Sequence, residues 1–115
     1  MSRDNASVLD IFLAGQRVLE FAQDLSRDEL ETDRMRHSAI LYQIEIMGEA
    51  TKRLSNDYRN QHPDIPWREI AGMRDIIVHQ YDRIDFDVVW SVVKTNIPAL
   101  LKLIAPLLPE ESMEP

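Results

Sequence analysis

The stretch from Thr32 to Leu54 reads TDRMRHSAILYQIEIMGEATKRL and decides the fold of this 115-residue chain. Its apolar and small side chains recur every three or four residues, which is the spacing of one face of an α-helix. Good helix formers fill most of the remaining positions. We therefore predict a long helix over residues 32–54. Its stripe consists of His37, Ile40, Leu41, Ile44, Met47, Gly48, Thr51 and Leu54.

The sequence before this stretch predicts another long helix over residues 8–25, followed by a tight corner. The residues at helical spacing are Val8, Ile11, Phe12, Gly15, Val18, Leu19, Ala22 and Leu25. Ser26 and Glu29 then have the spacing of a capping box, in which each side chain binds the backbone N–H of the other residue. We expect a short helical turn to begin there and to lead into the long helix.

The sequence after Leu54 predicts a loop and a third helix. Asparagine, histidine and proline crowd residues 56–66, and Pro66 is suited to the first position of a helix. Ile70, Met73, Ile76, Ile77 and Tyr81 form the apolar side of this helix. Gly72 interrupts the pattern, so we expect two short helical pieces to join there at an angle.

A last helix is predicted from Asp85, a suitable N-cap, to Leu108. Its valines individually favour a strand, but their helical period favours a helix. Pro98 should kink it near Lys94, because proline has no N–H to donate. The predicted fold is thus all-α, an antiparallel bundle of four to five helices in a single domain over 1–108. We expect residues 109–115 to form a disordered acidic tail.

The composition limits the classes of function. Thirteen Lys and Arg stand against twenty Asp and Glu, a net charge of -7, which argues against coating a nucleic acid through a broad basic surface. With no cysteine and three scattered histidines, we expect neither a metal site nor a cofactor. No signal peptide is evident, and we judge that no apolar run approaches membrane length. We expect a cytoplasmic protein that does not bind membranes.

The segment from Arg74 to Tyr81, RDIIVHQY, holds the candidate catalytic residues. Arginine offers a fixed positive charge whose planar shape matches phosphate, and histidine transfers protons readily near neutral pH. This pair suggests phosphate ester chemistry without a metal: His79 would deprotonate a ribose 2′-hydroxyl, and Arg74 would stabilise charge on the phosphoryl oxygens. Asp75 and Gln80, in the same segment, are supporting candidates.

Helix geometry constrains how these residues could meet. On a regular helix, five residues correspond to a rise of about 7.5 Å and a rotation of about 140°, so Arg74 and His79 would not share a face. Either the helix is distorted near its end, or a second subunit completes the site across a two-fold axis. We favour the dimer. Tyr81, seven residues from Arg74, would lie nearly on the same stripe of the helix.

Three pieces of sequence together carry a resemblance to a known family: IEIMGEA at 44–50, IPWREIAGMRD at 65–75 and HQY at 79–81. Their order and spacing resemble the HepT-like HEPN family, the toxins of HEPN/MNT, or type VII-like, toxin–antitoxin pairs. The resemblance implies a dimeric helical bundle with a metal-independent endoribonuclease site, in which Arg74 and His79 match the arginine, four residues, histidine pattern.

The resemblance also implies regulation by a partner. In such pairs a minimal nucleotidyltransferase, the antitoxin, transfers AMP to the tyrosine of the motif, which corresponds here to Tyr81. The expected partners are therefore RNA, the antitoxin and a second copy of the chain, alone or within a larger complex.

Other readings of the same residues remain open at this point. Arg74 could simply pair with Asp75, Glu69 or Asp82. The chain could be a non-catalytic dimeric binding module that docks the nucleotidyltransferase or only accepts a nucleotide on Tyr81. It could also be an assembly adaptor, because Trp67 and Trp90 lie in apolar helical patterns typical of core or interface anchors.

Overall fold

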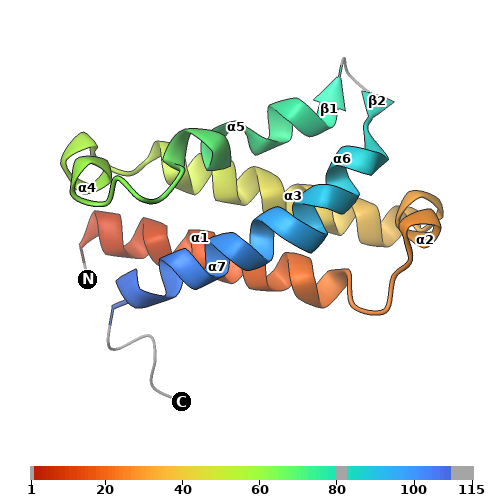
Figure 1. Ribbon diagram of the computed structural model, residues 1–115, viewed down its shortest axis with the longest axis horizontal. Coiled ribbons are helices and arrows are strands. Elements are labelled where there is room, and N and C mark those ends of the chain that lie inside the picture. Colours follow the sequence, from red (N-terminus) through yellow and green to blue (C-terminus); the bar gives the residue numbers. More distant parts are fainter. Residues whose placement is uncertain (1, 80–82, 110–115) are drawn as a thin grey trace.

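The computed structural model describes residues 2–79 and 83–109 and confirms the predicted all-α fold. Its long helical segments run up and down beside one another (Figure 1). They are α1 (Arg3–Phe21), α3 (Arg34–Lys52), α5 (Trp67–Ile77) and a final run of α6 (Phe86–Ser91), η1 (Val92–Asn96) and α7 (Ile97–Ile104). The shorter elements are α2 (Arg27–Thr32), α4 (Asn56–Gln61), β1 (Val78–His79), β2 (Arg83–Ile84) and η2 (Ala105–Leu107).

The core is formed by one apolar face from each long segment. Helix α3 packs against α1 on one side and α5 on the other, and α7 closes the bundle against α1. The predicted stripes account for most of this core, because residues three and four apart on a helix share a face. Side chains with no exposed surface include Val8, Ile11, Val18, Ile40, Ile44, Met47, Ile70, Ile77, Val89, Ile97 and Ile104.

Gly48 brings the backbones of α3 and α5 close together. A Cβ atom at this position would lie 3.2 Å from the carbonyl oxygen of Ala71, so a side chain there would press on backbone. Ile44 and Met47 on the same stripe of α3 are fully buried. The placement of α5, and of everything that follows it, therefore depends on the absence of a side chain at Gly48.

The predicted capping box forms the corner between α1 and α3. The N–H of Glu29 donates to the Ser26 hydroxyl oxygen at 3.1 Å, and the N–H of Ser26 donates to the Glu29 carboxylate at 2.9 Å. Hydrogen bonds from Ser26 to the Glu29 carboxylate, the one from the backbone N–H first, hold the pKa of Glu29 below its usual range. The short helix α2 begins there as expected, and Leu30 on it is buried in the core.

Helix α4 lies where we predicted only a loop. Ser55 caps it by accepting a hydrogen bond from the N–H of Tyr58 at 3.1 Å. The hydroxyl and the N–H of Ser55 both donate to Asp4, which anchors this turn to the start of α1 and lowers the pKa of that carboxyl. The asparagines and prolines nearby favoured a loop in our prediction. A serine cap and this distant contact with Asp4 stabilise a helix instead.

Helix α5 is continuous through Gly72, so the predicted angle there is wrong. A Cβ at Gly72 would meet nothing within 4 Å, because the residue faces open space. Pro66 is the N-cap residue and not the first helical residue. Trp67 is a core anchor as expected: it is buried, and its indole N–H donates to the carbonyl of His62 at 3.0 Å.

The last helix begins at the predicted N-cap, where Asp85 accepts a hydrogen bond from the N–H of Val88 at 3.1 Å. Before Pro98 the run changes to the π-helix η1, and the N–H of Ile97 donates to the carbonyl of Val92, five residues back. The disturbance expected around Lys94 thus takes the form of a wider helical turn. Beyond it, α7 continues to Ile104.

The final helical run also corrects an expectation about membranes. Phe86–Leu107 spans 22 residues and is, by length and composition alone, long and apolar enough to cross a membrane. Our judgement that no apolar run reaches that length is therefore wrong. The run contributes Val89, Ile97 and Ile104 to the core, and a core helix of a bundle has this same composition.

Candidate functional site

Arg74 lies in the last turn of α5, at the border of the buried face of the helix. Met73 beside it and Ile70 and Ile77, four residues before and three after, are buried, whereas 54% of the Arg74 side chain is exposed. Ile76, which we placed on the apolar side, is 53% exposed, so that assignment is wrong. The helix therefore presents a guanidinium and an isolated apolar side chain to solvent at the end nearest the hairpin.

The backbone leaves the helix between Arg74 and His79. Helix α5 ends at Ile77, the N–H of Val78 donates to the carbonyl of Arg74, and the chain enters β1. The β-branched sequence at 76–78 favours this extended conformation. Our prediction that the helix continues past Ile77 is therefore wrong, and Tyr81, which we placed on the Arg74 stripe, lies outside the described residues. The angular constraint of a regular helix does not apply to Arg74 and His79.

A two-stranded hairpin holds the backbone of His79. Strand β1 pairs with β2 in antiparallel register, with Val78 opposite Ile84 and His79 opposite Arg83. The hairpin is joined to α5 by a hydrogen bond from the N–H of Asp85 to the carbonyl of Ile77 at 2.8 Å. Gln80, Tyr81 and Asp82, which we named as a supporting candidate, the AMP acceptor and a possible ion-pair partner, lie outside the described residues.

Arg74 is only weakly engaged by its neighbour on α5. Its Nη1 lies 4.0 Å from Oδ1 of Asp75, whose side chain is 78% exposed. An exposed pair at this distance contributes little to stability. The charge of Arg74 is thus available to an anion, and the carboxylate of Asp75 beside it would weaken binding there.

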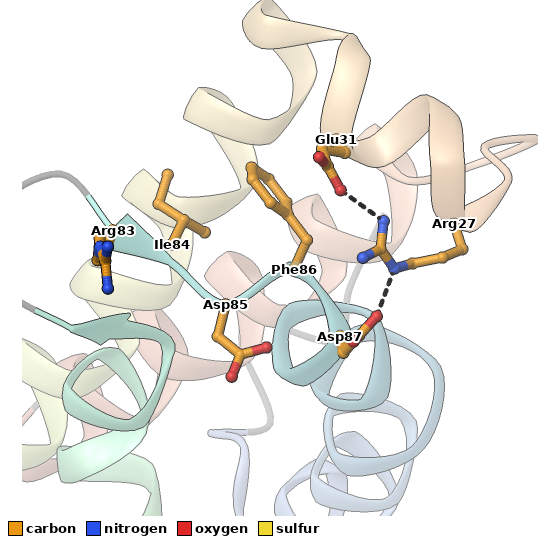
Figure 2. A pocket seen from close by; sticks show the side chains of 7 residues that line it. All are labelled: Arg27, Glu31, Arg83, Ile84, Asp85, Phe86 and Asp87. Carbon is orange, nitrogen blue, oxygen red and sulfur yellow. Dashed lines mark hydrogen bonds and ion pairs between the residues drawn. The ribbon is translucent and has the colours of Figure 1, made fainter.

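A pocket in the described part of the chain lies beside the hairpin, not over Arg74. Its volume is about 640 Å³, and α2, β2 and the start of α6 supply its walls (Figure 2). Charged side chains dominate the lining, with one aromatic ring among them. They are Arg27, Glu31, Arg83, Asp85, Phe86 and Asp87.

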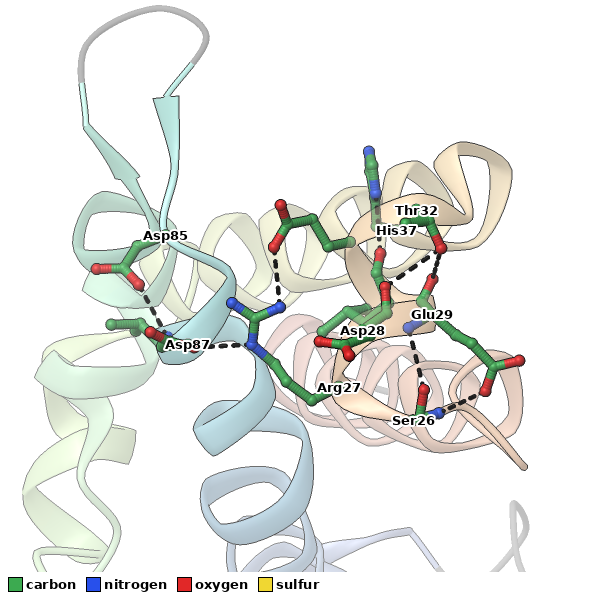
Figure 3. Close-up of polar contacts among 11 residues, drawn as sticks. Ser26, Arg27, Asp28, Glu29, Thr32, His37, Asp85 and Asp87 are labelled. Atoms are coloured by element: carbon green, nitrogen blue, oxygen red, sulfur yellow. Dashed lines mark hydrogen bonds and ion pairs between the residues drawn. The ribbon is translucent and has the colours of Figure 1, made fainter.

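Arg27 joins the two helices that border this pocket. Its Nε donates to Oδ1 of Asp87 at 2.7 Å, and its Nη1 donates to Oε1 of Glu31 at 2.9 Å (Figure 3). These hydrogen bonds, the one to Asp87 first, raise the pKa of Arg27. Nearby, Nδ1 of His37 lies 3.0 Å from the carbonyl oxygen of Leu30, and its ring centroid is 4.9 Å from that of Phe86.

A second, more apolar groove of about 340 Å³ runs between α5 and the final helical run. Ile70, Met73 and Leu100 line its floor, and Glu69, Asn96 and Leu103 are at its edges. Leu103 is 42% exposed. Because Glu69, Met73 and Ile76 follow one another at helical spacing, this groove leads along α5 toward the turn that carries Arg74.

The sequence family of the chain is decided by a match over most of its length. The family model described as "Ribonuclease HepT-like" matches residues 12–107, which include the second half of α1, all of α3 and α5, and the hairpin. The chain belongs to the HepT-like ribonuclease family. The predicted resemblance is confirmed, and the all-α bundle is consistent with it.

Relatives of this HepT-like chain carry ribonuclease names. "Probable ribonuclease HepT" of Thermococcus cleftensis is 39% identical over 101 residues, covering 87% of this chain and 92% of the relative. "Putative RNase MJ1380" of Methanocaldococcus jannaschii is 35% identical over 97 residues, or 84% of this chain and 89% of the relative. No solved structure matches the chain. The relatives support an RNase type of enzyme.

Sequence reasoning missed the charged pocket of this HepT-like chain. Arg27 and Glu31 have the spacing of an ordinary helix ion pair, which gave no reason to single them out. Asp87, the other partner of Arg27, lies 60 residues away. In the described residues no three His, Cys, Asp or Glu side chains gather closely enough to hold a metal ion.

Proposed function

We propose that this HepT-like chain is an endoribonuclease, the toxin of a HEPN/MNT pair, and that Arg74 and His79 cleave RNA without a metal. The observation that carries the proposal is the end of α5. There an exposed, weakly paired arginine is followed by a backbone that leaves the helix two residues before the histidine. This arrangement frees the histidine from the helical rotation that would separate the two residues.

The chemistry requires one proton acceptor and one charge stabiliser. The imidazole of His79 takes the proton from the ribose 2′-hydroxyl, whose oxygen attacks the adjacent phosphorus. The bond from phosphorus to the 5′-oxygen of the next nucleotide breaks, and that oxygen leaves with a proton returned by an imidazolium. The guanidinium of Arg74 stabilises the negative charge that gathers on the phosphoryl oxygens. The products are a 2′,3′-cyclic phosphate and a free 5′-hydroxyl.

We further propose that a second copy of the chain completes the site. The groove between α5 and α7, with Ile76 and Leu103 exposed beside it, offers an apolar surface next to the turn of Arg74. A two-fold contact along this face would bring the end of α5 in one subunit toward the same segment of the other. Arg74 of one copy would then act with His79 of the other.

Cleavage in the presence of a chelator tests the proposed activity. Purified protein incubated with RNA and excess EDTA is expected to cut at the same rate as without EDTA, because no step requires a cation. Mass spectrometry of the fragments should find cyclic phosphate ends. Loss of cleavage in EDTA that returns with Mg²⁺, or fragments with 5′-phosphate ends, would contradict the mechanism.

Regulation by a nucleotidyltransferase antitoxin belongs to the same proposal. AMP on Tyr81 would place a phosphate two residues beyond His79, where it could occupy the anion site of Arg74 and repel an RNA phosphate. Incubation with the partner enzyme and ATP should raise the intact mass by whole AMP units and stop cleavage. Tyr81→Phe is expected to lose both effects while cleaving RNA normally. A mass increase without any cleavage by the unmodified protein would favour the non-catalytic binding module.

A further inference from the structure

The charged pocket beside the hairpin has the size and position of a ligand site. Its volume of about 640 Å³ lies within the range of small-molecule sites in proteins, roughly 300–1,000 Å³. Strand β2 forms one wall, and its Arg83 is the residue directly opposite His79 in the hairpin. Opposed residues in an antiparallel pair lie only about 4.5–5.5 Å apart between Cα atoms. A nucleotide held in the pocket would therefore adjoin the segment that carries His79.

The charges of the pocket favour a base over a phosphate. Glu31, Asp85 and Asp87 outnumber Arg27 and Arg83, so a phosphate within it would meet net negative charge. Arg27 is already bound by two carboxylates. A ligand that suits this lining is neutral and rich in N–H donors.

The pair of Arg27 and Glu31 presents a donor group and an acceptor group side by side. The Glu31 carboxylate accepts from Arg27 through Oε1, and a carboxylate carries two oxygens that together accept about four hydrogen bonds. Arg27 uses its Nε and one Nη1 hydrogen in these bonds and has five N–H donors in all. Remaining acceptors and donors therefore lie next to each other along one edge of the pocket.

We propose that this pocket is a guanine-binding subsite that selects the RNA nucleotide next to the cleaved bond. Guanine presents N1–H and N2–H donors beside the O6 acceptor, the pattern that matches a carboxylate beside a guanidinium. Adenine, cytosine and uracil lack two adjacent donors on this edge. The proposal rests on the proposed ribonuclease function for the identity of the ligand as RNA. Phe86 gives the base an apolar wall, and Arg83 at the rim can meet the sugar–phosphate backbone.

Binding of uncleavable RNA tests the subsite separately from catalysis. Full-length protein is titrated into fluorescent 2′-O-methyl oligonucleotides that carry one guanosine, inosine, adenosine or cytidine in a uridine background. We expect the guanosine oligonucleotide to bind about tenfold more tightly than uridine alone, the size of one good paired base contact. Inosine, which lacks the N2 amino group, should lose most of this preference.

Two substitutions assign the preference to the pocket. Glu31→Gln and Asp87→Asn keep side-chain size but remove the acceptor-only carboxylates, and each should reduce the guanine preference to about twofold or less. Glu49→Gln, which breaks the exposed Glu49–Lys52 pair on α3, is the matched control and should keep it. Exposed ion pairs contribute little to stability, so thermal unfolding should change little; if Asp87→Asn unfolds, Glu31→Gln alone decides.

The outcomes distinguish this proposal from the ribonuclease proposal. Equal affinity for all bases, no measurable binding, or a guanine preference that survives Glu31→Gln would overturn the subsite. If the preference depends on Glu31 but no RNA is ever cut, the subsite stands and the proposed catalysis fails. If RNA is cut but bound without base preference, the proposed catalysis stands and the subsite fails.

Discussion

Replacing His79 with alanine should abolish RNA cleavage, lowering its rate by about 10²–10⁴-fold, the usual contribution of a general base. Arg74→Ala should lower the rate by about 10²–10³-fold, because the charge on the phosphoryl oxygens would lose its stabilising partner. The measurement is single-turnover cleavage of a labelled RNA with enzyme in excess. Because 54% of the Arg74 side chain is exposed, we expect thermal unfolding of Arg74→Ala to match the wild type, and thermal unfolding of His79→Ala is measured beside it.

Matched controls lie elsewhere in the chain. Arg68 is an exposed arginine in the first turn of α5, six residues before Arg74, and Arg68→Ala should cleave normally. His62 is the C-cap residue of α4 and packs on Tyr58 with ring centroids 4.6 Å apart. Helix α4 lies at the end of the bundle away from the hairpin (Figure 1). His62→Ala is the histidine control. Cleavage that persists in both Arg74→Ala and His79→Ala would end the catalytic proposal.

Mixing the two inactive variants should restore cleavage to about a quarter of the wild-type rate. If Arg74 of one subunit acts with His79 of the other, a mixed dimer has one intact site and one doubly defective site. When subunits of the two variants reassort at random in equal amounts, half of the dimers are mixed. Each mixed dimer has one intact site out of two. The measurement is the rate against mixing ratio, after brief mild denaturation to exchange subunits.

A site confined to one subunit predicts a different result for this mixture. Every subunit would then lack one of the two groups, and the rate would remain at background at all mixing ratios. A control that mixes Arg74→Ala protein with the Arg74→Ala, His79→Ala double variant should never regain activity. Sedimentation of the wild type as a monomer at all concentrations would also contradict the composite site.

The features that could be predicted from the sequence are those set by neighbours along the chain. The long helices follow from apolar spacing, and the capping box of Ser26 and the N-cap Asp85 need only a partner three residues away. Arg74 could be proposed as a candidate because the fixed charge and planar shape that suit phosphate belong to the arginine side chain itself. Local signals of this kind do not depend on the rest of the fold.

The features that were missed depend on distant contacts or on competition between local preferences. Helix α4 is anchored by Asp4, 51 residues before Ser55. The hairpin replaces the end of a predicted helix because the β-branched residues before His79 favour an extended chain once β2 pairs with them. The hydrogen bond from Arg27 to Asp87 joins α2 and α6, which lie 60 residues apart in the sequence. No periodicity could reveal these features.

The π-helix of the last segment has a consequence for comparing this chain with other members of its family. A π turn holds one more residue than the α turn it replaces, which is why Ile97 reaches back five residues to Val92. A homologue with an unbroken α-helix there would keep the same core face with one residue fewer. Its alignment should then contain a single-residue gap within 92–96, and ignoring that gap would assign Ile97 and Leu100 to solvent positions.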